Sequence, residues 1–111
     1  MPELQGKSAS TNEYNVGIAL DHFNLTYKFQ FELFGGRRLR GGQVLDFLVF
    51  RPFATPVQVF GEYWHTGQLG GDDKLQLAIL FQEFKIEPIV IWGEESETVE
   101  DAISAVRRKV L

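Results

Sequence analysis

Residues 44–50 form the run V-L-D-F-L-V-F, in which Asp46 is the single charged side chain. A strand this apolar is buried on both faces, so it belongs at the centre of a sheet. The rest of the chain then has to supply neighbouring strands and covering elements over both faces. This one segment therefore predicts a layered domain built around a central strand.

The segments on either side supply the other strands. Residues 27–34 alternate between apolar and polar side chains, which is typical of a strand with one buried face. Residues 57–60 predict a third strand after a short loop at 54–56. Residues 86–92 predict a fourth strand, and Pro88 either places it near an edge of the sheet or limits its pairing.

Three segments have helical patterns with capping residues in front of them. They are a helix from about Glu13 to Phe23 capped by Thr11 or Asn12, a helix to about Phe84 capped by Asp72 or Asp73, and a last helix capped by Thr98. Gly17 weakens the first helix by roughly 1 kcal/mol relative to alanine, so it predicts close packing at that point.

The resulting order, αβββαβα, predicts an α/β fold with a mixed four-stranded sheet and flanking helices. The three consecutive strands form an antiparallel meander, and the strand–helix–strand portion adds a parallel strand through a right-handed crossover. A chain of 111 residues has the length of one domain, which we place at residues 11–111. Residues 1–10 are polar and predict a flexible N-terminal arm.

Composition excludes several classes of function. The formal charge of −4 and the pI of about 5.1 argue against a general nucleic-acid coat, which would be strongly basic. The absence of cysteine excludes disulfides and cysteine-ligated zinc. No signal peptide and no membrane-spanning run is evident, so we expect an intracellular, cytoplasmic protein without a membrane partner.

The third predicted strand runs into G-E-Y-W-H at residues 61–65, which delivers a carboxylate, two large aromatic side chains and an imidazole. His65 fits a general base with a pKa near neutrality, and otherwise it is a rim histidine packed on Trp64. Glu62 is either a metal ligand or a solvated charge at the end of the strand. Asp73 fits a helix cap and also a ligand or water-positioning group.

Asp46 needs a partner, because a carboxylate buried alone in an apolar strand is strongly unfavourable. A divalent cation is one such partner, and an arginine from the glycine-bracketed turn before the strand is the other. That turn carries three arginines, Arg37, Arg38 and Arg40. They either grip phosphates or only solubilise the turn. Tyr63 and Trp64 either stack on bases and wedge between them, or belong to the core.

Four acidic and imidazole side chains follow the order of a known motif, E-D-x-H-D: Glu13, Asp46, His65 and Asp73. Gly61, Tyr63, Trp64 and His65 also fall on a G-x-F-W-H-like segment. In these features the chain resembles the PD-(D/E)XK nuclease superfamily, and within it the very-short-patch-repair-like branch that includes E-D-x-H-D homing endonucleases. The likeness covers residues 13–94 and implies a restriction-endonuclease-like core.

The resemblance implies a metal-dependent DNA endonuclease or nickase. Asp46 would hold Mg²⁺ or Mn²⁺ together with the Val59 carbonyl, and His65 would be the general base. Asp73 would orient the attacking water, and Glu13 would support the outer shell of the metal site. The acidic net charge implies weak DNA binding by the chain alone, so a partner protein or a homodimer would supply affinity.

The chain departs from the wider superfamily, because Gln58, Val59 and Phe60 stand where an acid-x-Lys sequence is expected. One rival interpretation follows: a catalytically silent nuclease fold that serves as a structural or interaction module, for instance in a phage particle or a DNA-processing assembly. A second rival is a Holliday-junction resolvase, which would need a two-fold dimer with paired sites.

Overall fold

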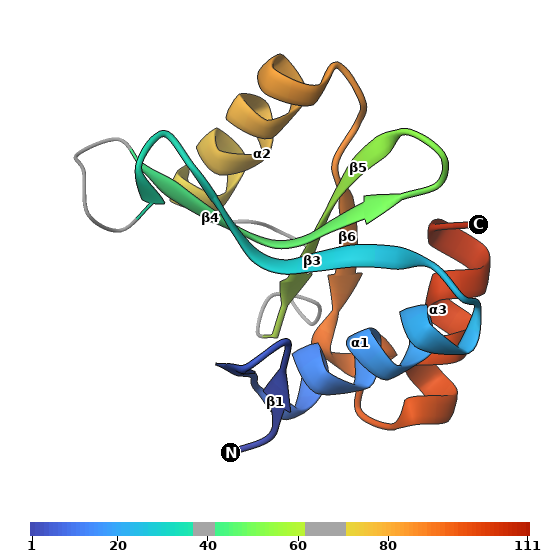
Figure 1. Ribbon diagram of the computed structural model, residues 1–111. Helices are drawn as coiled ribbons and strands as arrows, with labels where there is room; N and C mark the ends of the chain where they lie inside the picture. The colour runs from blue at the N-terminus through green and yellow to red at the C-terminus, as the bar shows by residue number, and fades with distance from the viewer. Residues whose placement is uncertain (37–41, 62–70) are drawn as a thin grey trace.

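A four-stranded sheet in the order β3-β4-β5-β6 forms the centre of the protein (Figure 1). The computed structural model describes residues 1–36, 42–61 and 71–111. The strands are β3 (Thr26–Leu33), β4 (Gln43–Phe50), β5 (Ala54–Phe60) and β6 (Ile89–Trp92). The first three pair antiparallel, and β6 pairs parallel to β5. The predicted meander with one added parallel strand is therefore confirmed.

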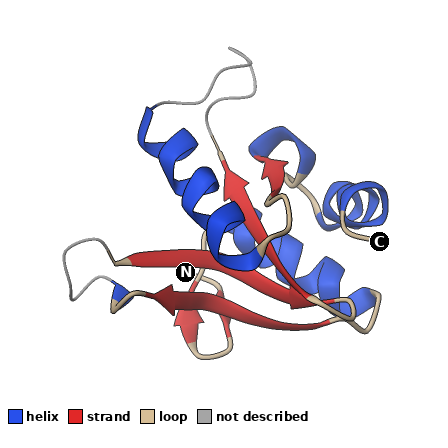
Figure 2. Cartoon of the chain, turned by 90° about the horizontal axis from the view of Figure 1, so that it is seen from above, coloured by secondary structure: helices blue, strands red, loops and turns tan. Residues whose placement is uncertain are grey.

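Helices cover both faces of this sheet (Figures 1 and 2). They are α1 (Thr11–His22), α2 (Gly71–Phe84) and α3 (Val99–Lys109). The larger core lies between the sheet and the α1–α3 pair, and Phe29, Phe47 and Val57 are among its buried side chains. The smaller core lies under α2 and contains Leu33, Leu45, Leu48 and Leu80. Because β4 contributes to both cores, it is the central strand that its apolar run predicts.

The boundaries of β5 and β6 differ from the prediction for reasons that involve proline. The expected loop at 54–56 is the first part of β5, where Pro56 pairs with Leu48. Successive backbone nitrogens in a strand point to alternate sides, and the Val59 amide points toward β4. The backbone nitrogen of Pro56, three residues earlier, therefore points toward the β6 side. The pairing of β5 with β6 begins only at Val57. The missing N–H therefore costs no ladder hydrogen bond. β6 begins only after Pro88 and is shorter than expected.

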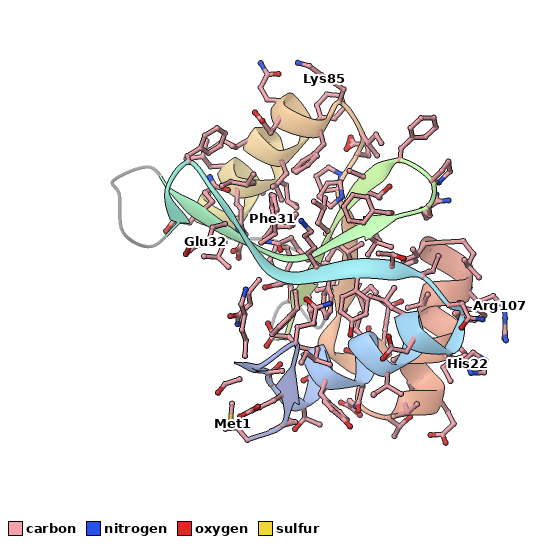
Figure 3. All side chains as sticks on the ribbon, viewed as in Figure 1. Met1, His22, Phe31, Glu32, Lys85 and Arg107 are labelled. Carbon is pink, nitrogen blue, oxygen red and sulfur yellow. The ribbon has the colours of Figure 1, made fainter. Side chains whose placement is uncertain are left out.

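The β3–β4 ribbon changes faces at Gln30. Tyr27 and Phe29 pack in the larger core, whereas Phe31 packs in the smaller one, although strict alternation would keep all three on one face. Gln30 has a left-handed backbone, with φ of 53°, and the ladder skips its pairing with Asp46. The ribbon consequently bends at this point, and Phe31 and Glu32 lie in the bend (Figure 3).

The N-terminal residues form a hairpin where the sequence predicts a loose arm. Strands β1 (Glu3–Leu4) and β2 (Lys7–Ser8) are joined by Gln5 and Gly6, whose φ values of 52° and 79° are those of a type I′ turn. Leu4 is buried against α1 at Gly17. A Cβ at Gly17 would lie 2.6 Å from Leu4 Cδ1, so the close packing predicted at this glycine is confirmed.

The helix starts agree with the predictions to within a few residues. Ser10 caps α1 in a capping box with Glu13, in place of the expected Thr11 or Asn12. The second helix begins at Gly71, just before the two expected capping residues. Thr98 accepts a hydrogen bond from the Asp101 amide and caps α3 as predicted.

Candidate functional site

Asp46 lies where the β4–β5 ladder ends. The paired positions run from Phe50 with Ala54 to Phe47 with Val57. Beyond them, the Asp46 amide donates to Gln58 Oε1 at 2.7 Å, and the Val59 amide donates to Asp46 Oδ2 at 2.8 Å. Two side chains thus take over the hydrogen bonds that backbone groups make in the rest of the ladder.

These two hydrogen bonds hold the Asp46 carboxylate at the end of the β4–β5 ladder, beside the backbone of Val59. Asp46 is partly exposed, whereas Gln58 is only 2% exposed. The sequence offered a cation or an arginine as the partner of Asp46, and the structure adds a third partner, the backbone amide of Val59. Gln58 was missed as a site residue, although a lone amide in the strand P-V-Q-V-F was the available signal.

The backbone of Val59 adds a second oxygen to this place. In an extended strand the N–H and C=O of one residue point to the same side. The Val59 carbonyl therefore points to the same side of β5 as the Val59 amide, which donates to Asp46 Oδ2. A carboxylate and a carbonyl are the hard oxygen donors that Mg²⁺ and Mn²⁺ prefer, and Mg²⁺ keeps several waters when few protein ligands are offered.

Across residues 1–36, 42–61 and 71–111, no group of three or more His, Cys, Asp or Glu side chains could hold a metal ion. A set of three such side chains at Asp46 would have to draw at least one member from residues outside these ranges. Those residues include Glu62, Tyr63, Trp64 and His65, together with Arg37, Arg38 and Arg40, so the roles predicted for them remain predictions. The chain leaves β5 at Gly61, two residues after Val59.

Glu13 has a structural role of its own. Its Oε1 accepts from the Ser10 amide at 2.8 Å, and its amide donates to Ser10 Oγ at 3.1 Å. The neighbouring Asn12 amide group donates to the Gly93 carbonyl at 2.9 Å and to Ser96 Oγ at 3.1 Å. The start of α1 is therefore fixed beside the carboxyl ends of the parallel strands β5 and β6, which is where α/β proteins commonly bind ligands.

Asp73 lies in the first turn of α2 beside Asp72, where negative charge favours the helix N-terminus. Its side chain is partly buried. Within the described residues, Asp73 and Asp46 do not belong to any group of three or more His, Cys, Asp or Glu side chains that could hold a metal ion. Its predicted part in orienting water therefore depends on the residues between β5 and α2.

The ends of β5 and β6 approach each other closely. A Cβ at Gly93 would lie 2.7 Å from the Gly61 carbonyl oxygen, so a larger side chain there would push the two strand ends apart. The rings of Phe60 and Trp92 pack beside them, with their centroids 6.0 Å apart. Gly93 opens the 3-10 helix η2 (Gly93–Glu95), which turns the chain toward α3.

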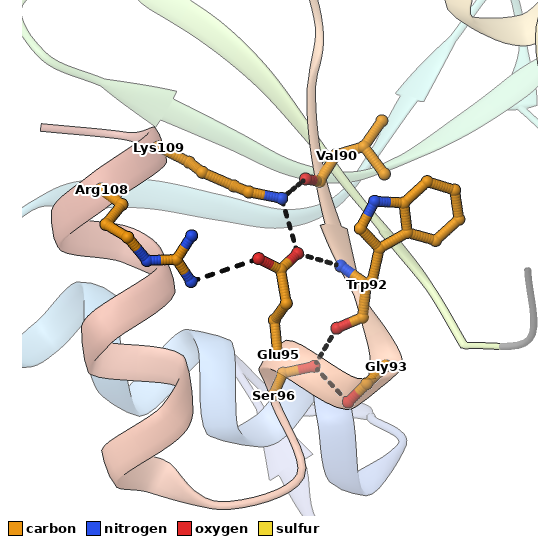
Figure 4. A network of polar contacts seen from close by, with 7 residues as sticks. All are labelled: Val90, Trp92, Gly93, Glu95, Ser96, Arg108 and Lys109. Atoms are coloured by element: carbon orange, nitrogen blue, oxygen red, sulfur yellow. Dashed lines mark hydrogen bonds and ion pairs between the residues drawn. The ribbon is translucent and has the colours of Figure 1, made fainter. Parts of the chain in front are cut away.

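A polar network around Glu95 fastens this turn to α3 (Figure 4). Glu95 accepts from the Trp92 amide at 3.0 Å and forms ion pairs with Arg108 and Lys109. Burial by itself raises the pKa of Glu95, but hydrogen bonds from Lys109, Trp92 and Arg108 outweigh burial and lower the pKa below its ordinary value. The sequence predicted only that the basic residues complement the dipole of the last helix.

Comparison with family models, with curated proteins and with solved structures finds no match to this chain. None of the helices within the described ranges is both long enough and apolar enough to cross a membrane.

Proposed function

We propose that this chain is a metal-dependent DNA endonuclease or nickase of the PD-(D/E)XK type. The observation that carries the proposal is the position of Asp46, whose carboxylate lies at the end of the β4–β5 ladder against the backbone of Val59. Two residues later the chain leaves β5 and enters the segment that contains Glu62 and His65. After the N-terminal hairpin, the order α1-β3-β4-β5-α2-β6-α3 agrees with the order that the resemblance implies.

In this proposal Asp46, the Val59 carbonyl and Glu62 would hold Mg²⁺ or Mn²⁺. Such a cation would supply charge stabilisation at the phosphate. His65 accepts a proton from the attacking water, and Asp73 orients that water. The capping box fixes the Glu13 side chain, which leaves its second oxygen for the outer shell of the site.

DNA is the proposed substrate, and the proposed contacts come from two segments. Arg37, Arg38 and Arg40 would bind backbone phosphates, and Tyr63 and Trp64 would stack on bases or wedge between them. The net charge of −4 opposes binding to a polyanion. A partner protein or a second copy of the chain would therefore supply part of the affinity.

Asp46→Asn tests this function most directly. Asparagine keeps an oxygen that can accept from the Val59 amide, so we expect the fold to survive while Mg²⁺- or Mn²⁺-dependent nicking of plasmid DNA is lost. Asp72→Asn, at an exposed position in α2, is the control with the same change of charge. Nicking by purified Asp46→Asn at the wild-type rate would remove Asp46 from the site.

The catalytically silent module is the second candidate, and one observation favours it. The carboxylates of Asp46 and Glu13 both have structural hydrogen-bond partners within the described part of the chain. Titration of the protein with Mn²⁺ in a calorimeter separates the two candidates. Binding that Asp46→Asn abolishes supports the nuclease, whereas a chain that neither binds Mn²⁺ nor nicks DNA supports the module.

A further inference from the structure

A cavity of about 500 Å³ lies on the outer edge of β3, between the N-terminal hairpin and the bend in the ribbon. We call it the hairpin cavity. It is lined by Gln5, Lys7, Lys28, Phe29, Gln30, Phe31 and Glu32. None of these residues belongs to the site around Asp46, and two of them carry ammonium groups.

Side chains from the hairpin hold one wall of the cavity in place. Gln5 Nε2 donates to the Tyr27 carbonyl at 2.8 Å, and Gln5 Oε1 accepts from the Phe29 amide at 2.9 Å. One glutamine side chain thus takes the place of a neighbouring strand along this edge. Lys7 Nζ donates to the carbonyls of Phe29 and Gln30, each at 3.2 Å, so its charge is fixed at the bend.

The two lysines leave donors available to a ligand. An ammonium group has three N–H donors, and the two carbonyls use two of those on Lys7. Lys28 is exposed, and its Nζ lies 5.7 Å from the centroid of the Phe31 ring. Among the residues that the structure describes, neither lysine forms an ion pair with a carboxylate. An anion would therefore find two ammonium groups here that are not held in ion pairs with carboxylates of the described residues.

Glu32 is the opposing charge in the cavity. Its side chain rests on the backbone at Gly36, where a Cβ would lie 2.7 Å from Glu32 Oε1. The carboxylate lies at the turn that follows β3 and leaves the cavity with a net charge of one positive unit. Glu32 should therefore weaken the binding of any anion in the cavity.

The position of the cavity relates it to Asp46. Gln30 occupies the place opposite Asp46 in the ribbon, between the pairs Phe29 with Phe47 and Phe31 with Leu45. Neighbouring strands lie about 5 Å apart, so the cavity and Asp46 lie on two sides of the same bent segment. A polyanion that crossed the bend would reach both places.

We infer that the hairpin cavity binds a backbone phosphate of the DNA substrate, with Lys28 and Lys7 as the donors; this inference rests on the function proposed above. Lysine binds phosphate as a point charge, so this contact would add affinity without sequence preference. Loss of one phosphate contact reduces the salt slope by about 0.9, which is a loss of roughly eightfold in affinity at 0.1 M salt.

Paired substitutions with opposite signs test the inference. The measurement is the affinity for a short labelled DNA duplex, across a salt series, in buffer with chelator so that nothing is cleaved. Lys28→Gln should weaken binding and flatten the salt slope, and Glu32→Gln should tighten binding. Lys85→Gln and Glu83→Gln are the matched controls, since both residues are exposed and flank the end of α2. Amine-reactive labelling should also show Lys28 protected by DNA and Lys85 unprotected.

The outcomes separate this inference from the proposed function. If Lys28→Gln and Glu32→Gln change DNA affinity no more than their controls do, the hairpin cavity is not a phosphate site, whatever the cleavage assay gives. If both variants act as expected while wild-type protein fails to nick DNA with Mg²⁺ or Mn²⁺, the result supports the phosphate site in the hairpin cavity and contradicts the proposed endonuclease activity. A chain that binds no DNA at low salt overturns the inference outright.

Discussion

Two side chains on neighbouring strands, Asp46 and Gln58, each accept a hydrogen bond from a backbone amide of the opposite strand and so set the place of the candidate site. Asp46 accepts from β5, and Gln58 accepts from β4, at the point where regular pairing stops. Each short bond satisfies a buried or partly buried amide that would otherwise lose its partner. The carboxylate that we propose as a metal ligand is therefore oriented by the sheet itself.

This arrangement makes Gln58 a positioning residue with a measurable cost. Gln58→Met keeps the volume but removes the oxygen that accepts from the Asp46 amide, which should destabilise the protein by about 1–3 kcal/mol. Gln43→Met, on the same ribbon, is the control, because Gln43 Oε1 is buried with no hydrogen-bond partner among the described residues and its removal should be close to neutral. Urea unfolding of both variants measures the difference, and equal changes would show that the Gln58 bond contributes nothing.

A positioning role also predicts an effect on metal binding that a general loss of stability would not produce. At a temperature where Gln58→Met is fully folded, its affinity for Mn²⁺ should fall relative to wild type, while Gln43→Met should keep the wild-type value. An unchanged affinity in Gln58→Met would limit Gln58 to a structural part.

At the scale of elements, the sequence was informative wherever a pattern is local. The apolar run of β4, the alternation of β3 from Thr26 to Phe29 and the Thr98 cap are all in the structure. The failures come from tertiary contacts. The N-terminal hairpin depends on Leu4 meeting Gly17, and the bend at Gln30 depends on a left-handed backbone in a segment whose alternation looks regular.

Part of the candidate site was predictable because the pattern that marks it is also local. A lone carboxylate in an apolar strand marks Asp46 without any structure, because burial makes an unpartnered charge costly. Its actual contacts with Gln58 and Val59 depend on the register of β4 against β5, which no local pattern specifies. The seven predicted residues at 37–40 and 62–65 lie outside the described ranges, so their roles stay predictions.

The stability that the turn η2, between β6 and α3, contributes to the fold should depend on pH through Glu95. Its folded-state pKa is lowered, so the stability that it contributes is present above its unfolded pKa and is lost as the pH falls through the folded value. Melting temperatures measured from neutral to acidic pH should therefore favour wild type over Glu95→Gln at neutral pH, with the two converging in acid. Glu94→Gln, its exposed neighbour, is the control and should show no such gap. A constant gap between wild type and Glu95→Gln at every pH would mean that ionisation of Glu95 is not the cause.

At the scale of the whole molecule, the two faces of the sheet are covered unequally. The core under α1 and α3 contains buried side chains from both helices, from β1 and from all four strands of the sheet. The core under α2 contains four buried leucines, and Leu80 is the one fully buried residue of α2. Leu75 and Phe81 on α2 remain 61% and 46% exposed. Regions with few buried apolar contacts open at lower free energy than the rest of a protein.

We therefore expect α2 to exchange its amide hydrogens faster than α1, α3 and β4 under native conditions. Hydrogen exchange followed by mass spectrometry gives this ranking directly. Leu80→Ala should cost about 2–5 kcal/mol of local stability, and it should speed exchange in α2 while leaving α1 and α3 close to wild type. Leu20→Ala, at an equally buried position in α1, is the matched variant and should speed exchange throughout the molecule, because the larger core holds most of the sheet. If both variants speed exchange everywhere to the same degree, the two layers unfold as one unit, and α2 is as firmly attached to the sheet as the helices on the other face.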